Sequence, residues 1–158
     1  MADENKLKQA KTAFTTLCKM LDEKEWNYKA DEENLAITCG ARGEDLPMEI
    51  EIRVDPERLL VILLSDMPFK VPEDRRAQLA LAVTVANYGL VDGSFDYNFL
   101  DGRILFRMTS SYRDSLVGKD MFEYMLMCSC VTIDNYNDKF LMVVKQDMQA
   151  KEIINFIK

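Results

Sequence analysis

The sequence contains no histidine among its 158 residues, and this absence excludes much of enzyme chemistry. Histidine titrates near neutral pH, supplies the base of most nucleophilic triads and is a frequent metal ligand. Catalysis would therefore have to use carboxylates, thiols, lysines or tyrosines. A glycine-rich phosphate loop is also missing, because the glycines at 89, 93 and 102 stand singly at expected turns.

Long apolar runs are scarce as well. The longest covers residues 79–86, whereas a membrane-spanning helix needs about 20 apolar residues. The N-terminus opens with acidic residues and lacks the basic start and apolar centre of a signal peptide. We therefore expect a soluble, cytoplasmic protein without a membrane partner.

The four cysteines form no Cys-x-x-Cys pair. Cys128 and Cys130 are two residues apart in an expected helix, so their thiols would point to different faces. Cysteines of a cytoplasmic protein are usually reduced, so we expect free thiols at Cys18 and Cys39 as well. The sequence predicts no metal site, no functional disulfide and no cofactor.

Acidic residues outnumber basic ones by 27 to 20, which gives a net charge of −7. A negative surface repels phosphate groups, so nucleic acid is not an expected partner. The acids cluster at residues 22–25, 31–33 and 44–45 without the spacing of a calcium loop. We interpret them as solvated surface, although a catalytic carboxylate pair could still be assembled by the fold.

Hydrophobic periodicity predicts an α+β fold of order α-β-β-β-β-α-β-β-α in one domain, residues 1–158. Residues 4–24 are apolar at three- and four-residue steps, as in a helix, and residues 48–54 alternate strictly, as in a strand. Further helices are expected at 72–88, 119–145 and 148–157. Since helices and strands come in runs, an antiparallel sheet with helices packed on one face is predicted.

Several connections are predicted from turn residues. Residues 40–47 are expected to form a loop, and Asp101-Gly102 is expected to form a two-residue hairpin turn. Gly89 is expected to end the second helix. Residues 59–64 are apolar at every position, which predicts a central strand that is covered on both faces or borders an interface.

Two helices carry more apolar residues than one buried face requires. Residues 121–131 contain three methionines, and residues 79–86 contain no charge. A helix that is apolar nearly all round has to be covered nearly all round. The sheet covers one side, and the other needs the final helix, a second copy or a bound client. The candidate dimer or client surface therefore consists of Met121, Met125, Met127, Leu81 and Val85.

The order and spacing of several short motifs resemble the YbjN family, which is described as regulators of bacterial sensory transduction. The resemblance covers nearly the whole chain, and each motif alone is only a turn or cap signal. The motifs are Val71-Pro72-Glu73, Arg75-Arg76, Ala86-Asn87-Tyr88-Gly89-Leu90, Gly93-Ser94-Phe95-Asp96 and Asp101 to Arg107, with Trp26, Tyr28, Leu46-Pro47, Ser65, Pro68, Asp134, Tyr136 and Val144 around them.

The resemblance implies a fold like that of type III secretion chaperones, with a curved antiparallel sheet, helices on one face and usually a dimer. Such chaperones hold extended clients against exposed strands and apolar pockets. No catalytic residues are carried over from the family. The main hypothesis is a non-enzymatic, chaperone-like homodimer that binds a polypeptide client. A regulatory adaptor acting through protein contacts is the alternative, and an enzyme using carboxylates or cysteine ranks third.

Overall fold

The computed structural model describes residues 3–158 as a six-stranded sheet with four α-helices. The strands are β1 (Tyr28–Asp31), β2 (Ala36–Arg42), β3 (Pro47–Asp55), β4 (Leu60–Asp66), β5 (Ser94–Asn98) and β6 (Arg103–Ser111). The helices are α1 (Glu4–Glu23), α2 (Arg76–Tyr88), α3 (Lys119–Lys145) and α4 (Ala150–Ile157), and the 3-10 turn η1 (Glu73–Arg75) precedes α2. The predicted α+β class is confirmed.

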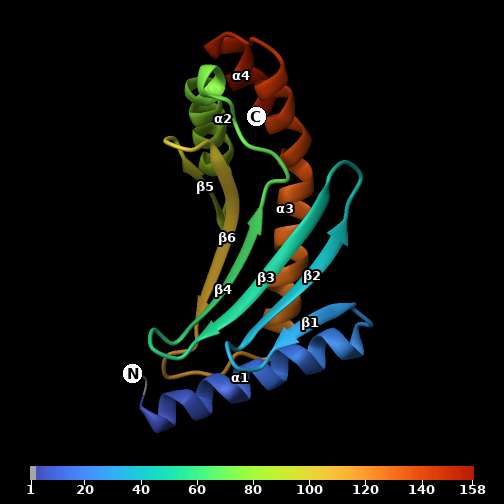
Figure 1. Ribbon diagram of the computed structural model, residues 1–158, viewed down its shortest axis with the longest axis vertical. Helices are drawn as coiled ribbons and strands as arrows, with labels where there is room; N and C mark the ends of the chain where they lie inside the picture. Colours follow the sequence, from blue (N-terminus) through green and yellow to red (C-terminus); the bar gives the residue numbers. More distant parts are fainter. Residues whose placement is uncertain (1–2) are drawn as a thin grey trace.

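The sheet has the order β1-β2-β3-β4-β6-β5, and every pair of neighbours is antiparallel. Figure 1 shows α3 running along one face of this sheet, which we call the inner face, while α1 crosses its lower end. Helices α2 and α4 lie together at the upper end (Figure 1). Alternate residues of each strand point to the inner face, as on β3, where Met48, Ile50, Ile52 and Val54 are buried.

Phe95 of β5 is the centre of the contact between α3 and the sheet. Its ring lies 5.0 Å from that of Phe140 and 5.5 Å from that of Tyr136, both on α3. A third ring, Phe106 of β6, is 5.2 Å away. All three contacts are edge-to-face, the arrangement that the charge distribution of aromatic rings favours. The cluster therefore fixes which side of α3 faces the sheet.

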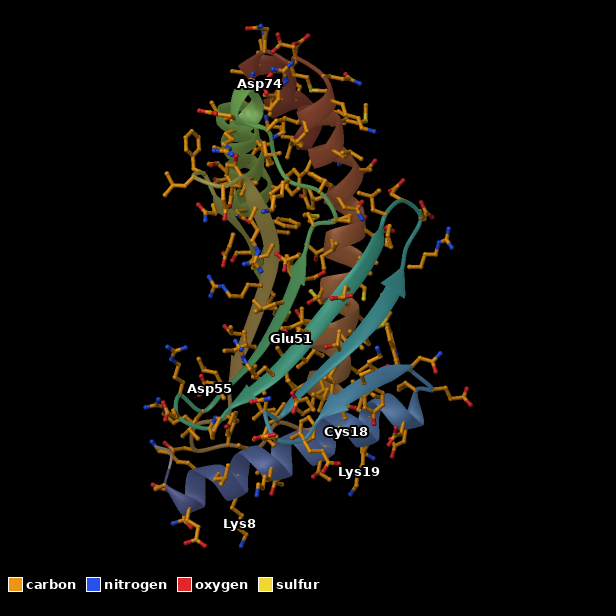
Figure 2. The ribbon with its side chains drawn as sticks, viewed as in Figure 1. Lys8, Cys18, Lys19, Glu51, Asp55 and Asp74 are labelled. Carbon is orange, nitrogen blue, oxygen red and sulfur yellow. The ribbon has the colours of Figure 1, made fainter. Side chains whose placement is uncertain are left out.

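The opposite, outer face of the sheet carries charged side chains that remain about half exposed. Glu51 lies on this face of β3, away from α3 (Figure 2). Arg103 and Arg107 of β6 form 2.6 Å ion pairs with Asp66 and Asp96. Ile62 of β4 pairs in register with the long Arg53 and is only 9% exposed. The predicted central strand is confirmed, and its outer side is covered mostly by neighbouring side chains.

The predicted loop over residues 40–47 is wrong at both ends. Strand β2 continues to Arg42 and β3 begins at Pro47, and these two residues are paired in register. Glycine and charged residues suggested a loop, but the pairing with β3 extends the strand past Gly40. Only residues 43–46 connect the two strands.

The predicted two-residue turn at Asp101-Gly102 is also wrong. Asn98 pairs with Arg103, so residues 99–102 form the loop. Gly102 has a φ of +76°, and its N–H donates to the Asn98 carbonyl at 2.8 Å. The carbonyl of Gly102 accepts the N–H of Val71 at 2.9 Å, which attaches the hairpin to the segment before α2. Gly89 does follow α2 as expected, with an ordinary φ of −88°.

The free edge of β5 is capped by the side chain of Asn87 from α2. Its Nδ2 donates to the Phe95 carbonyl at 2.9 Å, and its Oδ1 accepts the Phe95 N–H at 2.8 Å. The side-chain amide thus makes the same pair of hydrogen bonds that a neighbouring strand would make. This contact protects the sheet edge and anchors the residue on which α3 packs.

Replacing Asn87 with alanine is expected to destabilise the fold by about 1–3 kcal/mol, because both backbone groups of Phe95 lose their partner. Urea unfolding followed by circular dichroism measures the change. Asn135→Ala is the matched control, since Asn135 is exposed on α3, and we expect a change within about 0.5 kcal/mol. Equal effects of the two substitutions would contradict the capping role.

Gly102→Ala is expected to lower the free energy of unfolding by about 2 kcal/mol or more. The φ of Gly102 lies in the left-handed region, and a Cβ would lie 2.2 Å from the Val71 carbonyl oxygen. Gly118→Ala serves as the control, because a Cβ there meets no atom within 4 Å. The same unfolding measurement on both variants tests the difference. A Gly102→Ala chain as stable as Gly118→Ala would show that the turn tolerates a side chain.

Candidate functional site

The structure separates the five candidate surface residues of the sequence. Met121 and Met127 of α3 are 43% and 47% exposed. Met125, by contrast, is 1% exposed, because it lies on the side of α3 that packs into the core. Its place in the candidate surface is therefore corrected. Leu81 and Val85 of α2 are half-buried and pack against the core.

The outward side of α2 is covered by the final helix. Helix α4 packs directly on α2, and its Ile153 and Ile157 are both 1% exposed. A capping box between Gln149 and Glu152 begins α4, with the Gln149 N–H donating to the carboxylate at 2.7 Å. The sequence allows the final helix, a second copy or a bound client to cover α2, and in the structure the final helix, α4, does so.

An apolar stripe remains exposed on the side of α3 that faces away from the sheet. Tyr124, Met127 and Val131 are 48%, 47% and 56% exposed. Their spacing of three and four residues puts them on one side of the helix. We call this stripe, together with Met121, the α3 surface. A hydrogen bond to Asp92 raises the pKa of Tyr124 to about 12, so its hydroxyl is neutral at neutral pH.

A groove of about 370 Å³ adjoins this stripe and is lined by residues from distant parts of the chain. Met127 and Val131 belong to both the stripe and the groove. We call it the Trp26 groove. Its lining consists of Trp26, Gly40, Ala41, Arg42, Gly43, Met48, Met127, Cys130, Val131 and Asp134.

An unpaired part of the sheet edge borders the Trp26 groove. Strand β1 pairs with residues 36–39 of β2. Its first residue, Tyr28, lies opposite Cys39, so the pairing does not extend beyond Cys39. Within residues 3–158, no strand pairs with residues 40–42 of β2 on the side away from β3. The preceding Trp26 N–H donates to the Leu21 carbonyl of α1 instead. The backbone of β2 is therefore available for a further strand at this point.

Asp134 fixes the tip of the β2–β3 hairpin to α3. Its carboxylate accepts the backbone N–H of Glu44 at 3.1 Å and that of Asp45 at 3.5 Å. A Cβ on Gly43 would lie 2.0 Å from Oδ1 of Asp134, so only glycine allows this close approach. The contact holds the hairpin beside α3 and closes one end of the Trp26 groove.

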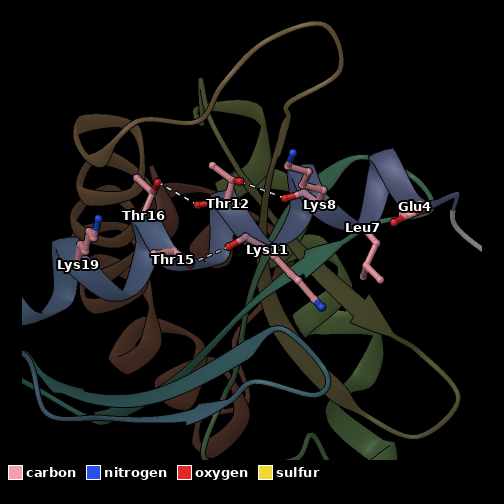
Figure 3. Close-up of a pocket in the computed structure, with 8 residues that line it drawn as sticks. All are labelled: Glu4, Leu7, Lys8, Lys11, Thr12, Thr15, Thr16 and Lys19. Atoms are coloured by element: carbon pink, nitrogen blue, oxygen red, sulfur yellow. Dashed lines mark hydrogen bonds between the residues drawn. The ribbon is translucent and has the colours of Figure 1, made fainter.

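A larger hollow, of about 580 Å³, lies along the outer side of α1 (Figure 3). All of its lining residues come from this one helix. The hydroxyls of Thr12, Thr15 and Thr16 each donate to a backbone carbonyl of α1, at 3.0, 2.9 and 3.0 Å (Figure 3). Because these hydroxyls are used locally, the charged groups that remain in the hollow are Glu4 and the three lysines at 8, 11 and 19, all on the open surface of one helix.

The reactive side chains show the features of structural residues. Burial raises the pKa of Cys39 and of Cys130 to about 11, so few of these thiols ionise near neutral pH. Burial also raises the pKa of Tyr112 to about 12, and its hydroxyl donates to the Asp55 carbonyl at 2.9 Å. Among residues 3–158, no three histidine, cysteine or acidic side chains form a group that could hold a metal ion.

Sequence reasoning found the excess of apolar residues on α3 but missed the groove beside it. In the sequence Trp26 stands out only as one of the family motif residues, whereas in the structure it lies before β1 and lines the groove. The contact of Asp134 with Gly43 and Glu44 joins the hairpin tip to a residue about 90 positions further along the chain, and no local pattern indicates it. Across the part of the chain that the structure describes, no helix is long and apolar enough to cross a membrane.

Comparison with solved structures shows the same fold in a known protein. The crystal structure of YbjN from E. coli, described as "a putative transcription regulator", superposes with a TM-score of 0.53 at 11% sequence identity. The match covers 83% of this chain and 87% of that one. At this identity the likeness shows the fold alone.

Comparison with protein families gives the assignment. No protein with a curated functional description matches the chain. The YbjN family model, described as "Putative bacterial sensory transduction regulator", matches residues 14–142. Because the match spans most of the chain, from within α1 almost to the end of α3, the resemblance drawn from the short motifs is confirmed. The chain belongs to the YbjN family.

Proposed function

We propose that this chain is a cytoplasmic, non-enzymatic regulator that binds another polypeptide through the α3 surface and the Trp26 groove. The observation that carries the proposal is the stripe of Tyr124, Met127 and Val131, about half exposed beside an apolar groove. Contiguous exposed apolar side chains on a protein surface mark interaction sites. The four unpaired cysteines fit a reducing compartment.

The edge of β2 favours a polypeptide over a small molecule as the ligand. An extended segment can hydrogen bond to residues 40–42 of β2, which have no strand partner on that side. Alternate side chains of the segment would then enter the Trp26 groove. Methionine suits such a site, because its flexible side chain adapts to partners of different shape. Met48 and Met127 both line the groove.

This binding surface fits either of the two binding roles considered from the sequence. A chaperone-like protein would hold a client segment there, and a regulatory adaptor would hold a signalling partner. The description of the family as regulators of sensory transduction favours the adaptor. The homodimer expected from the sequence stays a prediction, and the crosslinking experiment below distinguishes it from binding of a different polypeptide.

A photo-reactive phenylalanine analogue in place of Met127 is expected to crosslink the chain to another polypeptide in the cells that express it. Adding Val131→Glu is expected to reduce the yield about tenfold, because it places a charge in the apolar contact. Gel mobility and mass spectrometry of the adducts provide the measurement. Leu116→Glu is the matched control, since Leu116 is an exposed apolar residue outside this surface.

The same analogue in place of Thr109, on the outer face of β6, is expected to give no specific adduct. Equal yields at positions 127 and 109 would contradict the proposed binding surface. Adducts that contain only two copies of the chain would instead identify the α3 surface as a homodimer interface.

A further inference from the structure

We propose that the Trp26 groove binds a segment whose large apolar side chains are flanked by lysine or arginine. This inference rests on the proposed function and specifies the chemistry of the partner. The apolar part of the partner follows from the lining of the groove. Trp26 comes from the segment before β1, Met48 from β3 and Met127 from α3. A volume of about 370 Å³ is within the roughly 300–1,000 Å³ of pockets that enclose ligands.

The charge of the partner follows from four carboxylates at the hairpin end of the groove. Asp134 lines the groove, and its side chain contacts the backbone of Glu44 and Asp45. Asp138 lies one helical turn further along α3. The pKa of Asp45 is raised by desolvation and then by the negative charges of Asp138, Asp134 and Glu44. The four charges are therefore close enough to repel one another.

Within the protein, these charges are compensated by backbone N–H groups, which donate to Asp134 and Asp138. Among residues 3–158, none of the four carboxylates forms an ion pair with a lysine or arginine. Arg42 is the one basic side chain that lines the groove. Glu123, which is also on α3 but about three turns before Asp134, is paired with Lys24 at 2.9 Å. A cationic partner would relieve the mutual repulsion and would be attracted by the net charge of −7.

The same charges argue against a second copy in this groove. Two identical chains would each bring a net charge of −7 and the same acidic residues to a two-fold contact. Like charges placed opposite one another cost several kcal/mol across an interface. An acidic groove also excludes nucleic acid and anionic lipid as occupants. The remaining partner is a polypeptide with apolar residues between basic ones.

Selection from a display library of random peptides tests this partner chemistry. The intact chain is the bait, and the Met127→Glu chain is the counter-selection, with circular dichroism confirming that both are folded. We expect enriched peptides to carry large apolar residues next to lysine or arginine. Binding of the most enriched peptide, made synthetically, is then followed by the emission of Trp26, the single tryptophan in the sequence.

Two charge-reversed variants with the same net charge provide the control. Glu44→Lys with Asp45→Lys keeps the backbone N–H groups that Asp134 uses, and we expect about tenfold weaker binding of the peptide. Glu32→Lys with Glu33→Lys changes the turn between β1 and β2, at the other end of β1. For this variant we expect the affinity for the peptide to change by less than about twofold. Equal effects would show that only the total charge matters and would overturn the inference.

The outcomes separate this inference from the proposed function. Enriched peptides with acidic or neutral flanks that still require Met127 would overturn the inference and leave the proposed function standing. An absence of peptides that require Met127 would overturn both. A concentration-dependent mass of twice 18.2 kDa that Met127→Glu returns to 18.2 kDa would assign the surface to a second copy and would also overturn the inference.

Discussion

The packing of α3 on the inner face of the sheet is the constraint on which the rest of the structure depends. Phe95 makes edge-to-face contacts with Phe106 of β6 and with Tyr136 and Phe140 of α3. Asn87 holds the backbone of Phe95 from the other side. This cluster fixes the rotation of α3 and so buries Met125. The opposite side of α3, with Met127, is not covered by any element within residues 3–158.

The groove depends on that rotation and on the hairpin that reaches α3. Asp134 binds the backbone at the tip of the β2–β3 hairpin, where Gly43 allows close contact. Because β1 begins only at Tyr28, opposite Cys39, part of the β2 edge is left unpaired at the same place. An apolar floor, a free strand edge and an acidic rim thus come together from three separate segments. The account of function depends on this combination and on no single residue.

The sequence predicts the fold better than it predicts the site, for physical reasons. Periodicity reports local burial, so α1, β3, α3 and α4 were found close to their true bounds. It also indicates that α3 has more apolar residues than one buried side requires. When both sides of a helix are apolar, however, periodicity cannot say which side is buried. For this reason the sequence places Met125 on the exposed surface, whereas the structure buries it. The Trp26 groove requires contacts such as that between Gly43 and Asp134, which only the tertiary fold creates.

The most direct test of the central claim is whether the α3 surface is open in the isolated chain. The ten methionines can be labelled at their methyl carbons and their NMR signals recorded with a soluble nitroxide in the solvent. We expect strong broadening for the methyl groups of Met121 and Met127 and protection for Met125, in line with exposures of 43%, 47% and 1%. A Met127 signal as protected as that of Met125 would contradict the account, because another surface would then already cover the stripe.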